Sequence, residues 1–383
     1  MGPLTGIKVV EIAGLGPAPM CGMLLADMGA EVILVQRKAK AGAGVTEAAT
    51  AGKYAIANRG KKAIALDLKD PEAIKIVLGL ITEADALIEG FRPGVMERLG
   101  LGPDVCLARN PSLLYGRMTG WGQYGPLAQA AGHDINYIGI SGALYYSGHP
   151  SEAPFAPPSL VGDVGGGSLF LAMGILAGII NAQRTGRGQV IDSAITDGSA
   201  VMCSLLHSFH QAGAWSNERG DNIIDSAAPW YDSYACADGR YITLGPVEPQ
   251  FYSLLVELCG LTDDPLFAKQ YDTRAWPEAK AKMAEMFKTK TQSDWCALLE
   301  GTDVCFSPVL NFEEAPNHPH NRARDTFVDI NGVTQAAPAP KFSGTPSEIA
   351  SPPPLSGEHN DEILTRLGYS KKRINELKEN HII

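Results

Sequence analysis

The chain has 383 residues, of which 45% are hydrophobic and 19% are charged. This composition is typical of a soluble globular protein with two or three domains. The formal net charge of −10 argues against a nucleic-acid-binding protein, because duplex binding requires a broad basic surface. The 7 cysteines are scattered and form no C-x-x-C pair, so we expect neither a disulfide framework nor a zinc site.

The first elements of the chain follow the pattern strand, helix, strand. Residues 7–12 (IKVVEI) and 31–35 (EVILV) predict strands, and residues 20–28 predict a helix between them. Three such elements within about 30 residues predict a βαβ unit with parallel strands. The turn before the helix lacks the third glycine of a dinucleotide fingerprint, because Pro19 stands there, and this disfavours a nicotinamide-dependent enzyme.

The alternation of strands and helices continues to about residue 118. Residues 38–53 are mostly small and predict a mobile loop, residues 63–68 and 86–89 predict strands, and residues 72–82 predict an amphipathic helix. Residues 92–94 (RPG) are expected to open the next helix. We therefore predict an α/β fold whose large domain holds a mostly parallel sheet covered by helices.

The second half of the chain predicts a smaller α+β domain with a short antiparallel sheet. The expected boundaries place the large domain at 1–193 and 337–383, linkers at 194–223 and 316–336, and the small domain at 224–315.

No segment predicts a membrane anchor or a targeting signal. The N-terminus lacks a basic stretch followed by an apolar run. The longest apolar run, residues 169–180, has 12 residues, which is too short to span a bilayer and predicts a buried helix. We expect a cytoplasmic location and no membrane partner, while a mitochondrial or peroxisomal location stays open.

Three residues that can carry proton chemistry each lie in a distinctive run. His133 lies in AGHDINY at 131–137, Asp163 precedes three glycines, and Glu248 lies in VEPQFY at 247–252. A histidine and a carboxyl group can remove a proton from carbon and return it, provided that one is protonated when the other is not. A further carboxylate beside the imidazole would fix its tautomer. The joint pattern predicts a site that moves protons.

Each of the three residues also has a plainer interpretation. A single histidine in a globular protein is usually structural, and an aspartate before a helical run is most often an N-cap. A glutamate before a proline, as Glu248 is, is usually a solvated loop residue.

Several ordered runs together resemble the α-methylacyl-CoA racemases, within the family III CoA-transferase superfamily. The resemblance extends from about Leu4 to about Gly368. Besides the runs around His133, Asp163 and Glu248, it is carried by FRPGV at 91–95, RMTGWGQ at 117–123 and TGRGQVID at 185–192.

The resemblance implies an enzyme that epimerises 2-methylacyl-CoA thioesters at the α-carbon with no metal and no redox cofactor. It also implies an interlocked homodimer, with the site between the large domain of one subunit and the small domain of its partner. His133 and Asp163 match the two bases on opposite faces, and Glu248 matches the group that orients the histidine. The backbone N–H of Asp134 matches the donor that holds the enolate oxygen.

Coenzyme A carries several phosphates, so an acidic chain needs a local basic patch to bind it. Several cations fall near the ends of the first strands, where open α/β sheets bind ligands: Arg37, Arg59, Lys61, Lys62, Lys69, Arg92 and Arg98. By resemblance we expect Arg37, Lys69, Arg92 and Arg98, with Phe91, to bind the phosphates and adenine, and Tyr137 to line the pantetheine path.

Two other functions stay open. A family III CoA-transferase would use Asp163 as a nucleophile that carries the acyl group as an anhydride, and a non-catalytic CoA-binding protein would use neither base. The chain also departs from the racemase pattern at Gln36 and Lys38, at Ser226 and Ala227, and at Val164, so the preferred acyl chain is not predicted.

Overall fold

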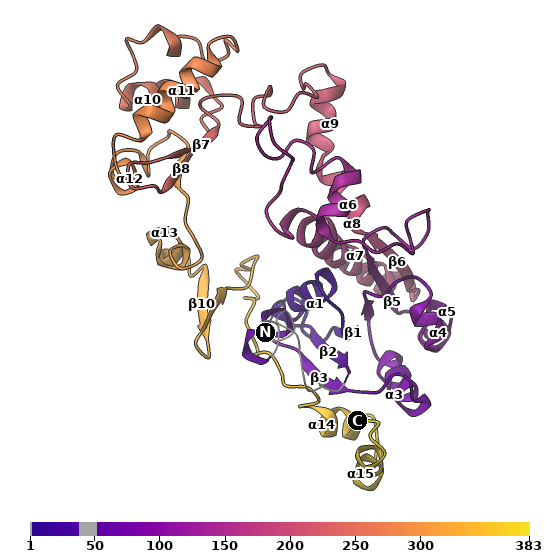
Figure 1. Ribbon diagram of the computed structural model, residues 1–383. Coiled ribbons are helices and arrows are strands. Elements are labelled where there is room, and N and C mark those ends of the chain that lie inside the picture. Colours follow the sequence, from indigo (N-terminus) through magenta and orange to yellow (C-terminus); the bar gives the residue numbers. More distant parts are fainter. Residues whose placement is uncertain (1, 38–51) are drawn as a thin grey trace. The chain divides into compact units, whose positions relative to one another are not determined.

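The computed structural model describes residues 2–37 and 52–383, which form two compact units (Figure 1). The first unit comprises Met1–Ala143, Pro157–Cys203 and Asp325–Ile383. The second comprises Leu144–Ala156 and Ser204–Arg324. The expected loop at 38–53 falls almost entirely outside the described residues.

A six-stranded sheet of parallel strands forms the centre of the first unit. Its order is β3-β2-β1-β4-β5-β6, so the direction of winding reverses between β1 and β4. This confirms the predicted α/β fold, and ligands of such sheets bind where the winding reverses, beyond the carboxyl ends of the strands. The strands are β1 (Lys8–Ile12), β2 (Glu31–Gln36), β3 (Lys62–Ala65), β4 (Ala86–Glu89), β5 (Leu114–Thr119) and β6 (Gln189–Ala194).

Helices cover both faces of the sheet because alternate strand residues point to opposite sides. Val10 and Ile12 of β1 belong to a core cluster that includes residues of α3 (Pro71–Thr82), α14 (Asn360–Arg366) and α15 (Lys371–Glu379). Val9 belongs to a second cluster, with residues of α1 (Pro17–Asp27) and α7 (Leu169–Thr185). Proline begins both α1 and α3, where its missing N–H costs nothing.

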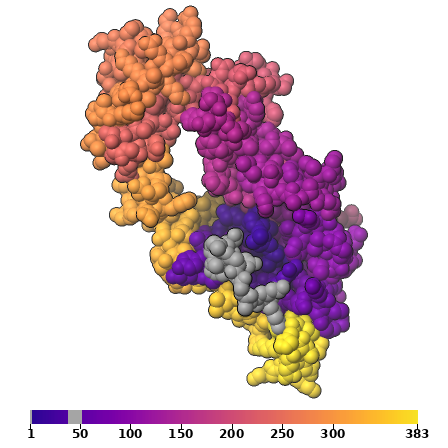
Figure 2. Space-filling view, in the orientation of Figure 1, coloured from indigo at the N-terminus to yellow at the C-terminus, as the bar shows by residue number. Residues whose placement is uncertain are grey.

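The C-terminal residues complete the first unit. The Ala65 N–H donates to Asn360 Oδ1 at 2.9 Å, and the Asp67 N–H donates to the Ile382 carbonyl at 3.0 Å. Figure 2 shows this C-terminal segment, in yellow, in contact with the N-terminal part of the chain.

The second unit has a three-stranded antiparallel sheet with a core of its own. Strands β7 (Asp232–Ala235), β8 (Tyr241–Leu244) and β9 (Phe306–Pro308) pair in that order. Helices α10 (Pro249–Leu258), α11 (Trp276–Phe287) and α12 (Gln292–Leu299) contribute to an aromatic core that includes Trp230, Phe287 and Trp295. The antiparallel sheet expected in this half is therefore present.

Structured elements occupy the two stretches expected to be linkers. Helix α8 (Ile195–Met202) and the hairpin of β10 (Phe327–Ile330) and β11 (Val333–Ala336) group with the first unit. Helices α9 (Ser204–Gln211) and α13 (Pro319–Ala323) group with the second. The observed groupings change between 143 and 144, between 156 and 157, between 203 and 204 and between 324 and 325. Residues 144–156, expected in the large domain, therefore group with the second unit.

Two of the cations placed by sequence near the ligand edge of the sheet are buried in ion pairs instead. Arg59 pairs with Asp27 at 2.6 Å and donates to Gln335 Oε1 at 2.9 Å. Lys61 pairs with Glu11 at 2.7 Å, and both side chains are fully buried. Their binding of a ligand phosphate would require breaking these pairs, so they are not part of an accessible basic patch.

The apolar run at 169–180 belongs to a longer helix than its composition indicated. A π-helical segment, Leu160–Ser168, runs directly into α7, and the continuous helix Leu160–Thr185 has 26 residues, of which an 18-residue stretch has a mean hydropathy of 1.7. By length and composition alone it could cross a membrane. In this fold it is a core helix on one side only, since Leu169, Met173 and Ile180 are at least half exposed.

Glycines let the π-helical segment lie directly against α8. A Cβ on Gly198 would lie 2.0 Å from the carbonyl oxygen of Gly166, so either backbone would have to move. Gly198→Ala is therefore expected to lower the free energy of unfolding by about 1–3 kcal/mol, measured by urea denaturation. Gly139→Ala in α6 (Asp134–Ser141) is the control, because a Cβ there meets no atom within 4 Å. A Gly198→Ala protein as stable as the control would contradict this packing.

Candidate functional site

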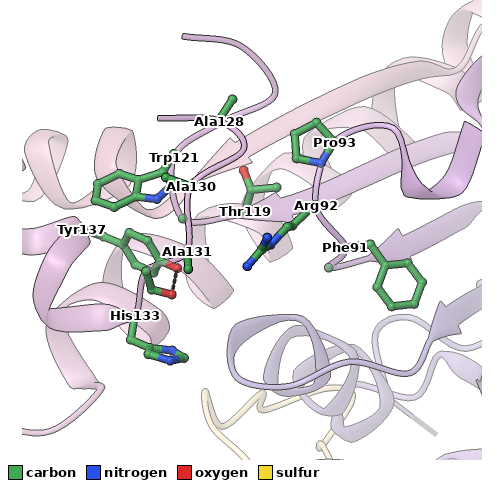
Figure 3. A pocket seen from close by; sticks show the side chains of 13 residues that line it. Phe91, Arg92, Pro93, Thr119, Trp121, Ala128, Ala130, Ala131, His133 and Tyr137 are labelled. Carbon is green, nitrogen blue, oxygen red and sulfur yellow. Dashed lines mark hydrogen bonds between the residues drawn. The ribbon is translucent and has the colours of Figure 1, made fainter. Parts of the chain in front are cut away.

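A cavity of about 230 Å³ lies beyond the carboxyl ends of β4 and β5. The loop after β4 supplies residues 90–93, and the end of β5 with the loop after it supplies residues 119–121. Ala128, residues 130–133 and Tyr137 complete the wall (Figure 3). The site therefore lies next to the point where the order of the strands reverses, as the topology favours.

His133 is placed in this cavity by the start of helix α6. It is the N-cap residue, with an extended φ of −135°, and its carbonyl accepts the Asn136 N–H at 2.8 Å. The Asn136 side chain in turn accepts the His133 N–H at 3.0 Å. These bonds hold the main chain of His133, while its side chain remains exposed at the cavity.

Asp163 lies in the first turn of the π-helical segment Leu160–Ser168 and is half-buried. Ser159 is the N-cap of that segment, so the interpretation of Asp163 as a plain N-cap is wrong. The Asp163 N–H donates to Asp134 Oδ1 at 2.7 Å. Its carboxyl group faces the turn after β1, because a Cβ on Gly16 would lie 3.6 Å from Asp163 Oδ2.

Burial raises the pKa of the Asp163 carboxyl, and the negative charge of Asp134 raises it further. A hydrogen bond from Ser159 and the charge of His133 act in the opposite direction and lower this pKa. The segments that hold the two residues adjoin, because Asp134, the residue after His133, accepts the Asp163 N–H. A carboxyl group that is held toward its neutral form is suited to donate a proton.

Tyr137 connects the two proton carriers with the cavity wall. Its hydroxyl donates to the Gly132 carbonyl, and burial together with the charge of Asp163 raises its pKa while Arg92 lowers it. Its ring meets Trp121 edge-on, with centroids 4.7 Å apart. A Cβ on Gly120 would lie 2.0 Å from the ring, so this position requires glycine.

Trp121 and Gly120 were not singled out by the sequence. They lie in the run RMTGWGQ, which carried the resemblance without a role attached to any residue. The only signal was that a tryptophan between two glycines follows the predicted alternation of strands and helices, which ends near residue 118. Its packing on Tyr137 depends on the fold.

The residues expected to bind coenzyme A lie in different relations to the cavity. Arg92 and Tyr137 line it, and the Arg92 guanidinium points into it (Figure 3). Phe91 contributes to the lining, but its side chain turns away and packs on a core cluster of the sheet. Arg98, at the end of α4 (Val95–Arg98), is exposed outside the lining.

Arg37 and Lys69 are exposed and follow β2 and β3 respectively. The strands are parallel, so both residues lie on the same edge of the sheet as the cavity. Lys62, by contrast, pairs with Glu31 and Glu362.

Glu248 belongs to the second unit, whereas His133 belongs to the first. It is exposed at the N-cap position of α10 and makes no side-chain capping hydrogen bond. Its charge contributes, after burial, to raising the pKa of the Cys305 thiol. The expected pairing of Glu248 with the imidazole therefore stays a prediction.

The arrangement places the His133 imidazole and the exposed Arg92 guanidinium at one cavity, and it ties Asp163, a carboxyl group of raised pKa, to the residue that follows His133. Such a set can move protons at a bound ligand, and the carboxyl group can also act as a nucleophile. The model of the CoA-transferase family III matches residues 4–360. The chain belongs to this family.

Comparison with curated relatives and solved structures refines this placement. The chain is 43% identical over 382 residues to the alpha-methylacyl-CoA racemase of Mus musculus, covering 99% of this chain and 97% of the relative. It is 41% identical to the alpha-methylacyl-CoA racemase of Homo sapiens, with the same coverage. The crystal structure of a CaiB/BaiF family protein from Brucella suis has a TM-score of 0.82 at 27% identity, covering 96% and 99% of the two chains.

Proposed function

We propose that this enzyme interconverts the (R) and (S) forms of 2-methylacyl-CoA thioesters by moving the α-proton from one face of the carbon to the other. The observation that carries this proposal is that His133 lines the cavity while Asp163, whose pKa is raised, donates its N–H to the carboxylate of Asp134, the residue after His133. Similarity to racemases over nearly the whole chain supports it.

In this reaction a neutral His133 removes the α-proton while a protonated Asp163 donates to the opposite face, and the reverse reaction exchanges the roles. The α-proton beside a thioester is weakly acidic, so the enolate oxygen needs a donor. The backbone N–H of Asp134 suits this, since it lies at the N-terminus of α6 where peptide dipoles favour negative charge. The residues themselves carry the protons, so the proposed step needs no metal and no redox cofactor.

We propose further that Glu248 reaches His133 from a partner subunit in a homodimer. An exposed apolar stripe supports an association between subunits, because Leu169, Met173 and Ile180 recur on one face of α7 and are half or more exposed. Coenzyme A would extend from Arg92 and Tyr137 at the cavity toward Arg37, Lys69 and Arg98, where its phosphates meet exposed cations.

The second candidate is a CoA-transferase that forms an acyl anhydride on Asp163. The Asp163 carboxyl group and the family itself favour it. His133 distinguishes the two reactions, because acyl transfer needs no base at the α-carbon.

The test is incubation of one enantiomer of a 2-methylacyl-CoA with the protein in heavy water, with no acceptor acid. We expect the sample to lose its optical activity and the α-carbon to take up one deuterium, which mass spectrometry detects. A matched incubation adds a carboxylic acid. Transfer of CoA to that acid with no α-deuterium would replace the racemase with the transferase.

A further inference from the structure

We propose that the Asp134 side chain is a positioning residue for Asp163: it anchors the Asp163 main chain and places a fixed negative charge beside the Asp163 carboxyl group. This inference rests on the proposed function, in which only the backbone N–H of Asp134 has a role.

The Asp134 carboxylate links the two segments that carry the proton donors and acceptors. Asp134 follows His133 at the start of α6. Its Oδ1 atom accepts the Asp163 N–H at 2.7 Å across 29 residues of sequence. One short side chain therefore fixes the distance between the helix that begins at His133 and the segment that holds Asp163.

The Asp163 main chain needs this partner. The first N–H groups of a helical segment have no acceptor within it, and Asp163 lies in the first turn of Leu160–Ser168. A carboxylate is a strong acceptor for such a group. The Asp163 carbonyl is held as well, by the Ser168 hydroxyl at 3.0 Å, so both sides of the residue are fixed.

A glycine makes the approach of the Asp134 carboxylate feasible. A Cβ on Gly162 would lie 2.4 Å from Asp134 Oδ1 and 3.0 Å from Cγ2 of Ile138. Any other residue at 162 would displace the carboxylate from the Asp163 N–H. The contact is therefore built into the main chain of both segments.

Asp134 is the charged group that raises the pKa of Asp163, second in effect to burial. Among the described residues the pKa of Asp163 is raised by burial and Asp134, and lowered by Ser159 and His133. Tyr137 is the other titratable group coupled to it. Helices α1, α7 and α8 and strands β5 and β6 also pack on this segment. Their titratable residues are not among the causes of the Asp163 shift: Cys21, Asp27, Tyr115, Arg117, Arg184, Asp192 and Asp197.

Two substitutions of Asp134 separate its hydrogen bond to the Asp163 main chain from the effect of its negative charge. Asp134→Asn keeps an oxygen that can accept the Asp163 N–H but removes the charge. It is expected to keep kcat within about tenfold of the wild-type value and to move the pH profile of exchange to lower pH, because Asp163 ionises more readily. Asp134→Ala removes both and is expected to lower kcat by about 100-fold with little change in KM, because a displaced base loses its alignment.

Asp104→Asn is the matched control, since Asp104 is an exposed aspartate in the first turn of another helix of the same unit, α5 (Pro103–Arg109). Its pH profile and kcat should equal those of the wild type. The inference is overturned by an Asp134→Asn enzyme with the wild-type pH profile, by an Asp134→Ala enzyme with the wild-type kcat, or by an Asn variant that fails to fold. Absence of α-deuterium exchange in the wild-type protein would instead reject the proposed function.

Discussion

Replacing Asp163 with asparagine is expected to stop inversion at the α-carbon while leaving deuterium exchange at one face. His133 can still remove the α-proton from one enantiomer and return a deuteron to the same face. The opposite face has no donor, so the rate of racemisation should fall by about 10²–10⁴-fold, the usual contribution of a general acid or base. The measurement is the deuterium content of each enantiomer, determined by chiral analysis of the acid released from the thioester. Only one enantiomer should be labelled.

His133→Ala provides the mirror experiment, because only the Asp163 face can then exchange. The two variants should label opposite enantiomers. A transferase that works through Asp163 would lose acyl transfer when Asp163 is replaced by asparagine. Neither the Asp163→Asn nor the His133→Ala variant of such a transferase would show deuterium exchange at the α-carbon. Racemisation by Asp163→Asn at the wild-type rate would remove Asp163 from the mechanism.

The Asp163→Asn protein should also be at least as stable as the wild type. The pKa of Asp163 is raised in the folded protein, mainly by burial. A carboxyl group whose pKa is higher in the folded than in the unfolded protein lowers the free energy of unfolding once the pH rises through its folded pKa. Below its unfolded pKa it has no such effect. A neutral asparagine avoids that cost at neutral pH, so a lost activity cannot be attributed to unfolding.

Local patterns were enough to predict the parallel sheet. The strand at 31–35 and the helix at 72–82 agree with β2 and α3 to within one or two residues. In each case the spacing of the apolar residues, together with a nearby turn or proline, was enough to predict the element. Elements whose partners are distant in sequence could not be placed in this way, such as the hairpin β10–β11, which accepts hydrogen bonds from Arg59.

The candidate site was predicted by residue types more than by geometry. The run at 131–137 identified His133, but nothing local indicates that the Asp134 carboxylate bonds to the main chain of Asp163. The π-helical form of Leu160–Ser168 and the close approach of Gly166 to Gly198 were not predicted either, because the two glycines lie in different segments. Charge alone was misleading for Arg59 and Lys61, whose burial is decided by the packing of α1 on the sheet.

Lys61→Met is expected to destabilise the protein by about 3–5 kcal/mol, the usual cost of leaving one member of a buried ion pair alone. The Lys61 Nζ atom lies 2.7 Å from Glu11 Oε2 and donates to the Pro19 carbonyl at 3.0 Å. It therefore joins β1, the start of α1 and the residues before β3. Urea denaturation measures the loss, and Lys62→Met is the control, with at most about 1 kcal/mol expected because its ion pairs are partly exposed.

The stability lost in Lys61→Met should increase as the pH rises. Burial raises the pKa of Glu11, and Lys61 opposes that rise. Without Lys61 the folded pKa of Glu11 rises further above its unfolded value, so stability is greatest at low pH, where Glu11 is buried neutral, and falls as the pH rises through the folded pKa. Lys61→Met should therefore be closer to the wild type at pH 5 than at pH 8.

Adding Glu11→Gln to Lys61→Met removes the uncompensated charge. The double variant should regain part of the stability and should no longer lose more stability at pH 8 than at pH 5 relative to the wild type, because a neutral amide costs far less to bury than a carboxylate. The double variant tests whether the pair stabilises the fold through its charges or only fills space. If Lys61→Met alone is as stable as Lys62→Met at every pH, Glu11 must find water or another partner when the lysine is gone, and the junction of β1 with α1 is less tightly packed than the full burial of both side chains indicates.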